Sequence, residues 1–527
     1  MWQQTYFPIA NSLLWSSLVA ALPVAALLYA IGIRHVAAWV SSLLGLMAAI
    51  AVALLAYRMP AGLAFDSALY GAAFGAFPIF WVIYWAILLY RLTVDTGNFE
   101  ILKESIGQLT ADKNLQALLI AFAFGAFLEG AAGFGTPVAV AAAILGGLGF
   151  SAFYAAEICL LANTAPVAFG SLAIPLVTLA ATTGLPLEAL SKQVGRLCAP
   201  VSLFIPAYLV MVMGGRRAIR EAWPAALTCG VTFAATQFAV SNYVGPYLTD
   251  ILSSLTAMVS LVLLLQFWQP AGARTATGPR FRFLEIVRAW SPYLLLVLFI
   301  LAWSFHSIQS VLNQASLSFG WPGLHNHIRQ LPPVVAKAGP YAAIYRFRYL
   351  AEAGTACAFA TVASAMLLRV GPVRFFRLAI DSAVQLRFAF ISITAVLALA
   401  FVMNYSGATA TLGLAFAATG RAFPFFSAIL GWLGVFLTGS DTSSNALFGG
   451  LQKVTAYRLG LSPVLTAGTN SAGGVMGKMI SLQSISVAAA AAGLKAEEEP
   501  RLFRSTLKHS LLLASVVGVL SLVYAYS

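Results

Sequence analysis

A glutamate followed by three glycines stands at the end of a long apolar run. Residues 128–137 read LEGAAGFGTP and directly follow the apolar stretch from Leu115 to Leu128. A charged side chain at the centre of a bilayer costs roughly 2.5 to 3.5 kcal/mol even on the lenient insertion scale. If this stretch crosses a membrane, Glu129 needs a functional explanation, and taking up and releasing a proton is chemistry that its carboxyl group can perform.

Three further motifs of small and polar residues accompany this one. They are ANTAPVAFG at residues 162–170, TGSDTSSN at residues 438–445 and TNSAGGVMGK at residues 469–478. Each half of the chain therefore carries an acidic motif followed by an Asn-centred motif. Interruptions at corresponding places of two halves indicate a transporter site built from broken helices. The alternative is that the glycines only let helices pack closely.

The elements that must position these motifs are membrane-spanning helices. Of 527 residues, 60% are hydrophobic and only 9% are charged, and the mean hydropathy is +0.87. We therefore predict an all-α polytopic membrane protein with about 12 to 14 spans. We expect the whole chain, 1–527, to form one transmembrane domain with two repeats, over about 60–215 and about 350–495. Candidate spans include Ser12–Ile33, Val36–Tyr57, Ala68–Tyr90, Val201–Gly214, Ser253–Trp268 and Ser510–Tyr526.

Basic residues in the short connectors predict how the chain is oriented. The net charge of +13 is spread over connectors instead of forming one stripe, which argues against nucleic-acid binding. Three clusters are expected in the cytoplasm by the positive-inside rule, so the uncharged N-terminus is expected outside. The segment 306–349 also contains basic residues, but a single span separates it from the second cluster, so it is expected outside as well. The first apolar run exceeds a usual signal peptide and is expected to remain as a helix. The clusters are Arg216, Arg217 and Arg220; Arg274, Arg280, Arg282 and Arg288; and Arg369, Arg374 and Arg377.

In these motifs the chain resembles the L-lactate permease family of bacterial proton-coupled monocarboxylate transporters. The similar blocks are FGAFLEGAAGFGTP at 124–137, ANTAPVAFG at 162–170, LGWLGVFLTGSDTSSNALFG at 430–449 and GGVMGKMI at 473–480. The resemblance covers nearly the whole chain. It implies an inner-membrane permease that imports lactate or glycolate with a proton, and kinship with ion transporters that have inverted repeats and re-entrant hairpins. Where the family has Ser-Pro-Gln, this chain has Ser481-Leu482-Gln483, which lacks the proline that would set a turn.

A lactate ion must have its carboxylate neutralised or hydrogen-bonded before it leaves water. Half-helix N-termini provide N–H donors for this without a buried cation, while amide and hydroxyl side chains can bind the carboxylate or the 2-hydroxyl group. The alternative for each polar residue is that it caps a helix or bonds to nearby backbone. The predicted substrate-binding residues are Gly133, Gly135, Thr136, Asn163, Thr164, Ser440, Thr442, Ser443, Ser444, Asn445, Asn470, Ser471 and Lys478.

Proton coupling requires a buried group that can take up a proton, and Glu129 and Asp441 meet this requirement. Each could instead be a helix-end carboxylate that reaches the headgroups or pairs with a cation. Lys478 could pair with the substrate or with Asp441, or it could lie at the membrane interface. Glu157 and Asp381 are weaker candidates because they lie nearer to expected helix ends.

The sequence therefore predicts a secondary transporter that imports L-lactate and related 2-hydroxymonocarboxylates with protons. The competing interpretation is an anion channel for small carboxylates, although no repeated filter motif is present. The four cysteines are widely spaced in apolar surroundings, so neither a disulfide framework nor a zinc site is expected. No other metal or cofactor is predicted. The sequence contains no zinc-protease, serine-hydrolase or nucleotide-binding motif, so it indicates neither an enzyme nor a primary pump. The expected partners are the substrate, the proton and the lipid bilayer.

Overall fold

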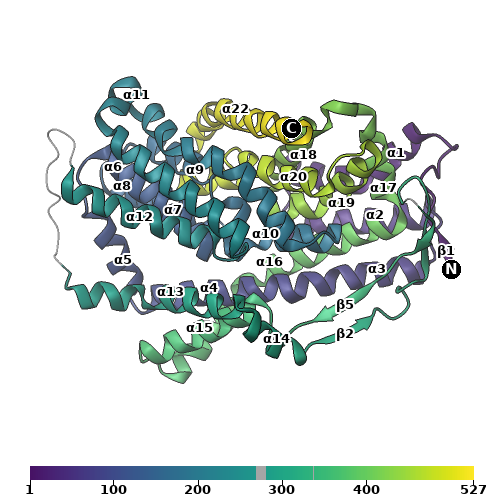
Figure 1. Cartoon of the computed structure of the whole chain (residues 1–527), viewed down its shortest axis with the longest axis horizontal. Helices are drawn as coiled ribbons and strands as arrows, with labels where there is room; N and C mark the ends of the chain where they lie inside the picture. The colour runs from purple at the N-terminus through teal and green to yellow at the C-terminus, as the bar shows by residue number, and fades with distance from the viewer. Residues whose placement is uncertain (134, 269–280, 336) are drawn as a thin grey trace.

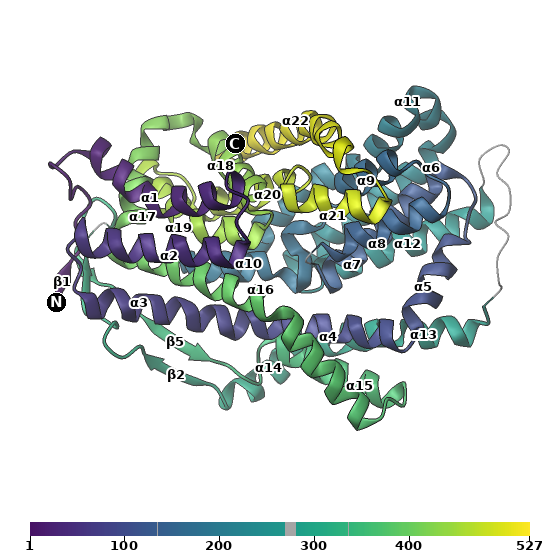
Figure 2. The same cartoon turned by 180° about the vertical axis from the view of Figure 1, so that it is seen from behind.

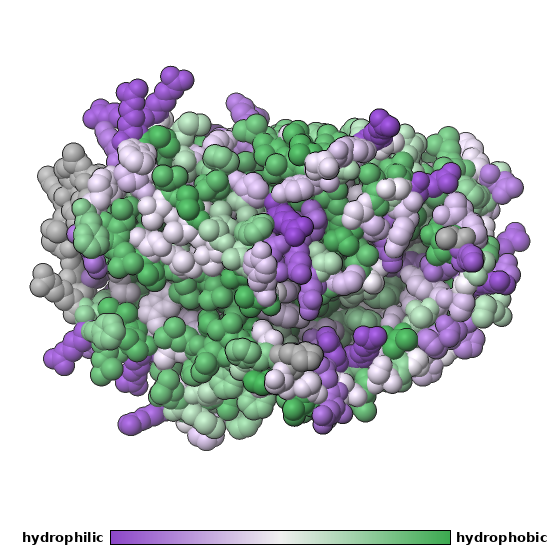
Figure 3. All heavy atoms as spheres, in the orientation of Figure 1, coloured by the Kyte–Doolittle hydropathy of each residue, from purple (hydrophilic) through white to green (hydrophobic). Residues whose placement is uncertain are grey.

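The computed structural model describes residues 1–133, 135–268, 281–335 and 337–527, and most of them are helical. Within these residues, eleven helices are long and apolar enough to cross a membrane, or twelve if a bent pair counts as one span. The prediction of an all-α polytopic membrane protein is confirmed, although eleven spans lie just below the expected 12 to 14 and twelve lie at its lower end. Most helices run along the long axis of the molecule (Figure 1), and hydrophobic side chains cover much of the face shown in Figure 3.

A scaffold of long helices forms one side of the molecule (Figure 2). α2 and α3 pack along the long helix α16, and α4 packs against α15, which in turn contacts α13. The approach of α3 to α16 depends on Gly71, where a Cβ atom would lie 2.8 Å from the Cα atom of Ala398. The bounds are α1 (Leu13–Gly32), α2 (Ala38–Leu55), α3 (Ala61–Phe74), η1 (Gly75–Phe80), α4 (Trp81–Asp95), α13 (Phe283–Ser304), α15 (Ala353–Leu367) and α16 (Pro372–Ser406).

The first half of the chain contains a helical hairpin and a broken span. One continuous helix covers Lys113–Ala131, and α8 returns beside it after a turn. Gly133 and Gly135 have φ angles of +61° and +83°, which glycine adopts without a steric penalty. Together, α9 and the helical segment after it are long and apolar enough for one span, and they are bent by 63° at a short break. The bounds are α6 (Lys113–Gln116), η2 (Ala117–Phe124), α7 (Gly125–Ala131), α8 (Thr136–Gly147), α9 (Ala152–Ala162), η3 (Val167–Phe169) and α10 (Gly170–Thr183).

The second half of the chain also contains a helical hairpin and a break between two helices. α18 ends at a glycine, α19 returns beside it, and α20 is separated from α21 by a short break. Each new helix begins with a local cap, because Ser440, Ser462 and Ser481 each accept a hydrogen bond from the backbone N–H three residues later. The prediction of broken helices is confirmed. The bounds are α17 (Ala408–Phe416), η4 (Ala417–Ala422), α18 (Phe423–Thr438), α19 (Asp441–Leu459), α20 (Pro463–Lys478) and α21 (Leu482–Ala492).

α11 (Leu187–Tyr243) consists of two helical segments that pack against each other. Gly215 breaks the helical geometry, with φ +63° and ψ −155°. Ser191 near its start donates a hydrogen bond to the carbonyl oxygen of Ser241 near its end, at 2.8 Å. α12 (Thr249–Phe267) packs on α11, and α22 (Glu499–Tyr526), which follows η5 (Ala496–Glu498), packs on α18 and α20.

Short strands show which parts of the chain share a side of the molecule. β1 (Trp2–Gln3) pairs with β3 (Ile328–Gln330), so the N-terminus and the segment 306–349 lie together, and their location outside the cell stays a prediction. The bend of α11, with Arg216, Arg217 and Arg220, lies at the opposite end (Figure 1). Arg274 and Arg280 of the second basic cluster lie outside the described residues. The remaining bounds are α5 (Asn98–Gly107), α14 (His306–Gln314), β2 (Leu317–Gly320), β4 (Gly339–Pro340) and β5 (Ile344–Phe347).

Candidate functional site

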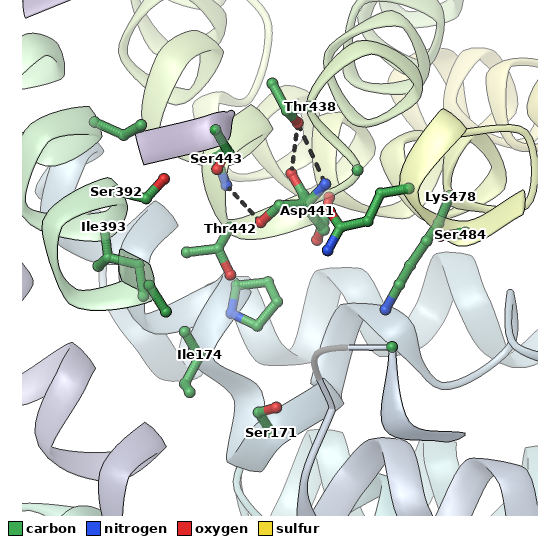
Figure 4. Close-up of a pocket in the computed structure, with 18 of the residues that line it drawn as sticks. Ser171, Ile174, Ser392, Ile393, Thr438, Asp441, Thr442, Ser443, Lys478 and Ser484 are labelled. Atoms are coloured by element: carbon green, nitrogen blue, oxygen red, sulfur yellow. Dashed lines mark hydrogen bonds between the residues drawn. The ribbon is translucent and has the colours of Figure 1, made fainter. Parts of the chain in front are cut away.

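The beginnings of four helices meet around one cavity of about 270 Å³. Its wall includes Gly135 before α8, Ser171 in α10, Thr442 in α19 and Ser484 in α21, while α1, α2 and α16 close the other side (Figure 4). The first N–H groups of a helix lack partners within the helix, and the aligned peptide dipoles place a partial positive charge there. The cavity is therefore suited to a small anion.

A buried ion pair joins the two halves of the chain at the cavity wall. Lys478 Nζ, at the end of α20, lies 2.8 Å from Glu129 Oε1, near the end of α7. The side chains are 12% and 4% exposed, so both charges are largely removed from water. The predicted pairing of Lys478 with Asp441 is not the one observed, because the helix end that carries Lys478 faces the break after α7. Desolvation offsets the attraction in such a pair, so its net contribution to stability is small.

The backbone beside this ion pair is strained. Ser171, Leu172 and Ala173 have φ angles of +47°, +56° and +60°, and left-handed backbone costs about 1 to 2 kcal/mol for each residue other than glycine. Ser171 Oγ donates to the carbonyl oxygen of Ala132 at 2.9 Å, which ties the start of α10 to the break after α7. A Cβ atom at Gly170 would lie 2.7 Å from Glu129 Oε1, so a glycine there makes room for the glutamate.

Asp441 lines the same cavity but is held by neutral groups. Its Oδ2 atom accepts hydrogen bonds from Ser471 Oγ at 2.6 Å and from Asn445 Nδ2 at 3.2 Å. Its Oδ1 atom is buried and has no hydrogen-bond partner in the described part of the chain. Asp441 is 3% exposed, and it lies in the first turn of α19 next to Thr442 and Ser443, whose side chains also line the cavity.

Behind Asp441, buried amides form a hydrogen-bonded network. Asn445 Nδ2 also donates to the carbonyl oxygen of Pro175 at 3.1 Å, and Asn445 Oδ1 accepts from Asn470 Nδ2 at 2.9 Å. Asn470 Oδ1 accepts from Gln452 Nε2 at 3.0 Å. Asn445, Asn470 and Ser471 are fully buried and lie behind the cavity wall. The network fixes α19, α20 and α10 to one another.

The other predicted residues also divide into those that line the cavity and those that do not. Gly135, Ser440, Thr442, Ser443 and Lys478 line the cavity together with both carboxylates. Ser444 instead donates to the carbonyl oxygen of Gly431 at 3.1 Å, and Thr164 donates to that of Leu161 at 2.7 Å. Gly133, Thr136 and Asn163 lie at the breaks without lining the cavity. Substrate contact by any of these residues remains a prediction.

Several residues at the site were not predicted from the sequence. Ser171 directly follows the ANTAPVAFG motif, and Gln483 and Ser484 begin α21, so proximity to a motif was the available signal. α21 begins without a proline, because Ser481 Oγ accepts from the Ser484 N–H at 3.2 Å. Asp250, at the start of α12, is a further buried carboxylate, with an exposed fraction of 1%. It belongs to none of the four motifs, and the only signal for it in the sequence is an acidic residue at the start of an apolar stretch.

Comparison with known proteins establishes the family. The model of the L-lactate permease family matches residues 16–527. The chain belongs to the L-lactate permease family. It is 44% identical to the L-lactate permease of Bacillus subtilis over 99% of this chain and 98% of that protein. It is 43% identical to the glycolate permease GlcA of Escherichia coli over 100% and 98% of the two chains.

As a member of a permease family with many apolar helices, the chain is a multi-pass membrane transporter and not an enzyme. A further relative, the L-lactate permease of Salmonella typhimurium, is 43% identical over 100% of this chain and 98% of that protein. Among solved structures, Neisseria gonorrhoeae MtrF aligns with a TM-score of 0.48 and 12% identity, over 90% of this chain and 86% of that one. A likeness at that level carries no argument, so the expected kinship with inverted-repeat ion transporters stays a prediction.

Proposed function

We propose that this permease imports L-lactate and related 2-hydroxymonocarboxylates such as glycolate, together with protons, across the bacterial inner membrane. The observation that carries the proposal is the meeting of four helix beginnings around the Glu129–Lys478 pair. The relatives' names, L-lactate permease and glycolate permease, support the choice of substrate. A cavity of about 270 Å³ equals the volume of about nine water molecules in the liquid, which suits a small carboxylate.

In the proposed binding mode, the substrate carboxylate lies among the N–H groups at the starts of α10 and α19. Thr442 and Ser443 supply hydroxyl groups that can donate to the carboxylate or accept from the 2-hydroxyl group. Lys478 adds a positive charge, but only if its bond to Glu129 is weakened. The substrate and Glu129 therefore compete for one ammonium group.

This competition gives a route for coupling. A proton on Glu129 neutralises the carboxylate, which releases Lys478 to pair with the substrate anion. Proton and substrate then each raise the affinity for the other by the same factor, as linkage requires. Asp441 is the second candidate proton carrier, because it lines the cavity and its buried Oδ1 atom has no hydrogen-bond partner among the described residues.

We also propose that the regions of about 60–215 and 350–495 are two inverted repeats. Each contains a helical hairpin followed by a broken span. The contacts between them are reciprocal, because α10 of the first packs on α19 of the second, and α21 of the second packs on α8 of the first. Such an arrangement favours a shared site at the interface of the repeats.

Uptake by proteoliposomes tests this function. With purified protein and labelled L-lactate, we expect saturable uptake that is accelerated by an inward proton gradient and competed by glycolate. Glu129→Gln should abolish the acceleration, whereas Glu104→Gln, at an exposed carboxylate of α5, should preserve it. Flux that never saturates would instead favour a channel. An unchanged response to the gradient in Glu129→Gln and Asp441→Asn would remove both carboxylates from the mechanism.

A further inference from the structure

Asp250 is a buried carboxylate that the mechanism above does not use. It lies in the first turn of α12 and is 1% exposed. Neither of its carboxylate oxygens has a hydrogen-bond partner within the residues described here. An ionised carboxylate without a hydrogen-bond donor is costly to bury, whereas the neutral acid is tolerated much better. The geometry therefore favours a protonated Asp250 in this conformation.

The position of Asp250 places it behind the central ion pair. A Cβ atom at Gly130, the neighbour of Glu129, would lie 2.8 Å from the Cβ atom of Asp250. The titratable groups whose charges reach Asp250 are Glu129 and Lys478 on the cavity side, and the Cys198 thiol of α11 lies within reach of its charge. Asp250 therefore lies close enough for its charge to interact electrostatically with the Glu129–Lys478 pair.

Along the chain, Asp250 comes less than one helical turn after residues that line a second cavity, although Asp250 itself is not part of that lining. This cavity has a volume of about 700 Å³, and Pro246 and Tyr247 line it. It also contains charged groups, including Lys192 and an ion pair between Arg348 and Glu352 with an N–O distance of 2.7 Å. It is lined by residues of α11, α13 and α15 and lies apart from the substrate cavity.

We propose that Asp250 relays the coupling proton between this second cavity and Glu129, on a route separate from that of the substrate. In the relay step, the O–H bond of the Asp250 carboxylic acid breaks and an O–H bond forms on the Glu129 carboxylate. Asp250 becomes negative, Glu129 becomes neutral and Lys478 is released, so charge and atoms balance. Asp250 then regains a proton from the second cavity. The relay rests on the proposed proton-coupled function.

Two transport modes of the same protein test the relay. Counterflow of labelled against unlabelled lactate needs no net proton movement, whereas gradient-driven uptake does. For Asp250→Asn we expect counterflow within about twofold of the wild type and gradient-driven uptake reduced about tenfold or more, as the loss of a coupling step requires. The control is Glu104→Gln, at an exposed glutamate of α5, which should leave both modes unchanged.

The possible outcomes separate the relay from the function beneath it. Coupled uptake by the wild type together with an unaffected Asp250→Asn variant overturns the relay alone. A wild type that transports lactate without responding to protons overturns the proposed function, and the relay with it. If Asp250→Asn loses both modes, Asp250→Glu decides, since restored uptake supports a proton-carrying role and continued loss in a well-folded variant refutes it.

Discussion

Two buried carboxylates line one cavity in different surroundings. Glu129 is bound to the ammonium group of Lys478, whereas Asp441 accepts hydrogen bonds from the neutral side chains of Ser471 and Asn445. The surroundings of Glu129 include a full positive charge that can bind a substrate anion, whereas the hydrogen-bond donors to Asp441 are neutral. We infer that the Glu129 region governs binding and coupling together. The Asp441 region acts in coupling alone, and the buried amide network behind Asp441 holds this part of the cavity wall in position.

Removing the cation should have the largest effect. Lys478→Ala leaves Glu129 buried without its counter-charge, which costs about 3 to 5 kcal/mol of stability when one partner of a buried pair is lost. We also expect uptake of lactate to fall about a hundredfold, which corresponds to about 2.7 kcal/mol of lost binding. Thermal unfolding of the purified protein and uptake by proteoliposomes measure the two effects.

A double variant separates stability from transport. Glu129→Gln with Lys478→Met removes both charges, so the melting temperature should recover toward that of the wild type while uptake stays lost. If uptake also recovers, the pair is only structural and the contrast between the two regions fails.

The Asp441 region should respond differently. In Asp441→Asn the amide oxygen can still accept from Ser471 and Asn445, so we expect nearly unchanged stability. Gradient-driven uptake should fall about tenfold, because a proton carrier is lost, and the remaining uptake should no longer depend on pH. Uptake measured across a pH series checks this, and a preserved pH response would assign coupling to Glu129 alone.

The breaks could be predicted from the sequence because local chemistry sets them. Gly133 and Gly135 adopt positive φ angles, and Ser440 caps α19, so the motifs themselves carry the information. The side of each helix that faces the cavity could not be predicted. Thr442 and Ser443 line the wall, whereas Ser444 and Asn445 point into packed neighbours, and only the packing of α19 against α10 and α20 decides this.

Contacts between distant segments could not be predicted from the sequence either, because they also depend on how the helices pack. Lys478 meets Glu129 across 349 positions because α20 ends beside the break after α7. Nothing in the spacing of the motifs distinguishes that partner from Asp441. Asp250 becomes relevant only because α12 packs against α7, so no motif could identify it.

A smaller effect is expected where the backbone approaches Glu129. In Gly170→Ala the new Cβ atom would lie 2.7 Å from Glu129 Oε1, so the ion pair must shift. We expect a KM for lactate raised about three- to tenfold, which corresponds to about 0.7 to 1.4 kcal/mol. The control is Gly147→Ala at the end of α8, where a Cβ atom meets nothing within 4 Å. Equal kinetics in the two variants would show that the pair tolerates displacement.

A variant of the amide network should differ from Lys478→Ala, because it should lower stability while having the smallest effect on uptake. Asn470→Ala leaves Asn445 Oδ1 without its hydrogen-bond donor and Gln452 Nε2 without one of its two acceptors, which costs about 1 to 3 kcal/mol for such buried groups. Because Asn470 lies behind the cavity wall, the KM of the protein that remains folded should stay within about twofold of the wild type. Thr442→Ala, at the wall itself, should raise the KM without lowering the melting temperature. A strongly raised KM in Asn470→Ala at unchanged stability would place Asn470 in contact with the substrate, and Asn470 would then belong to the cavity wall instead of the network behind it.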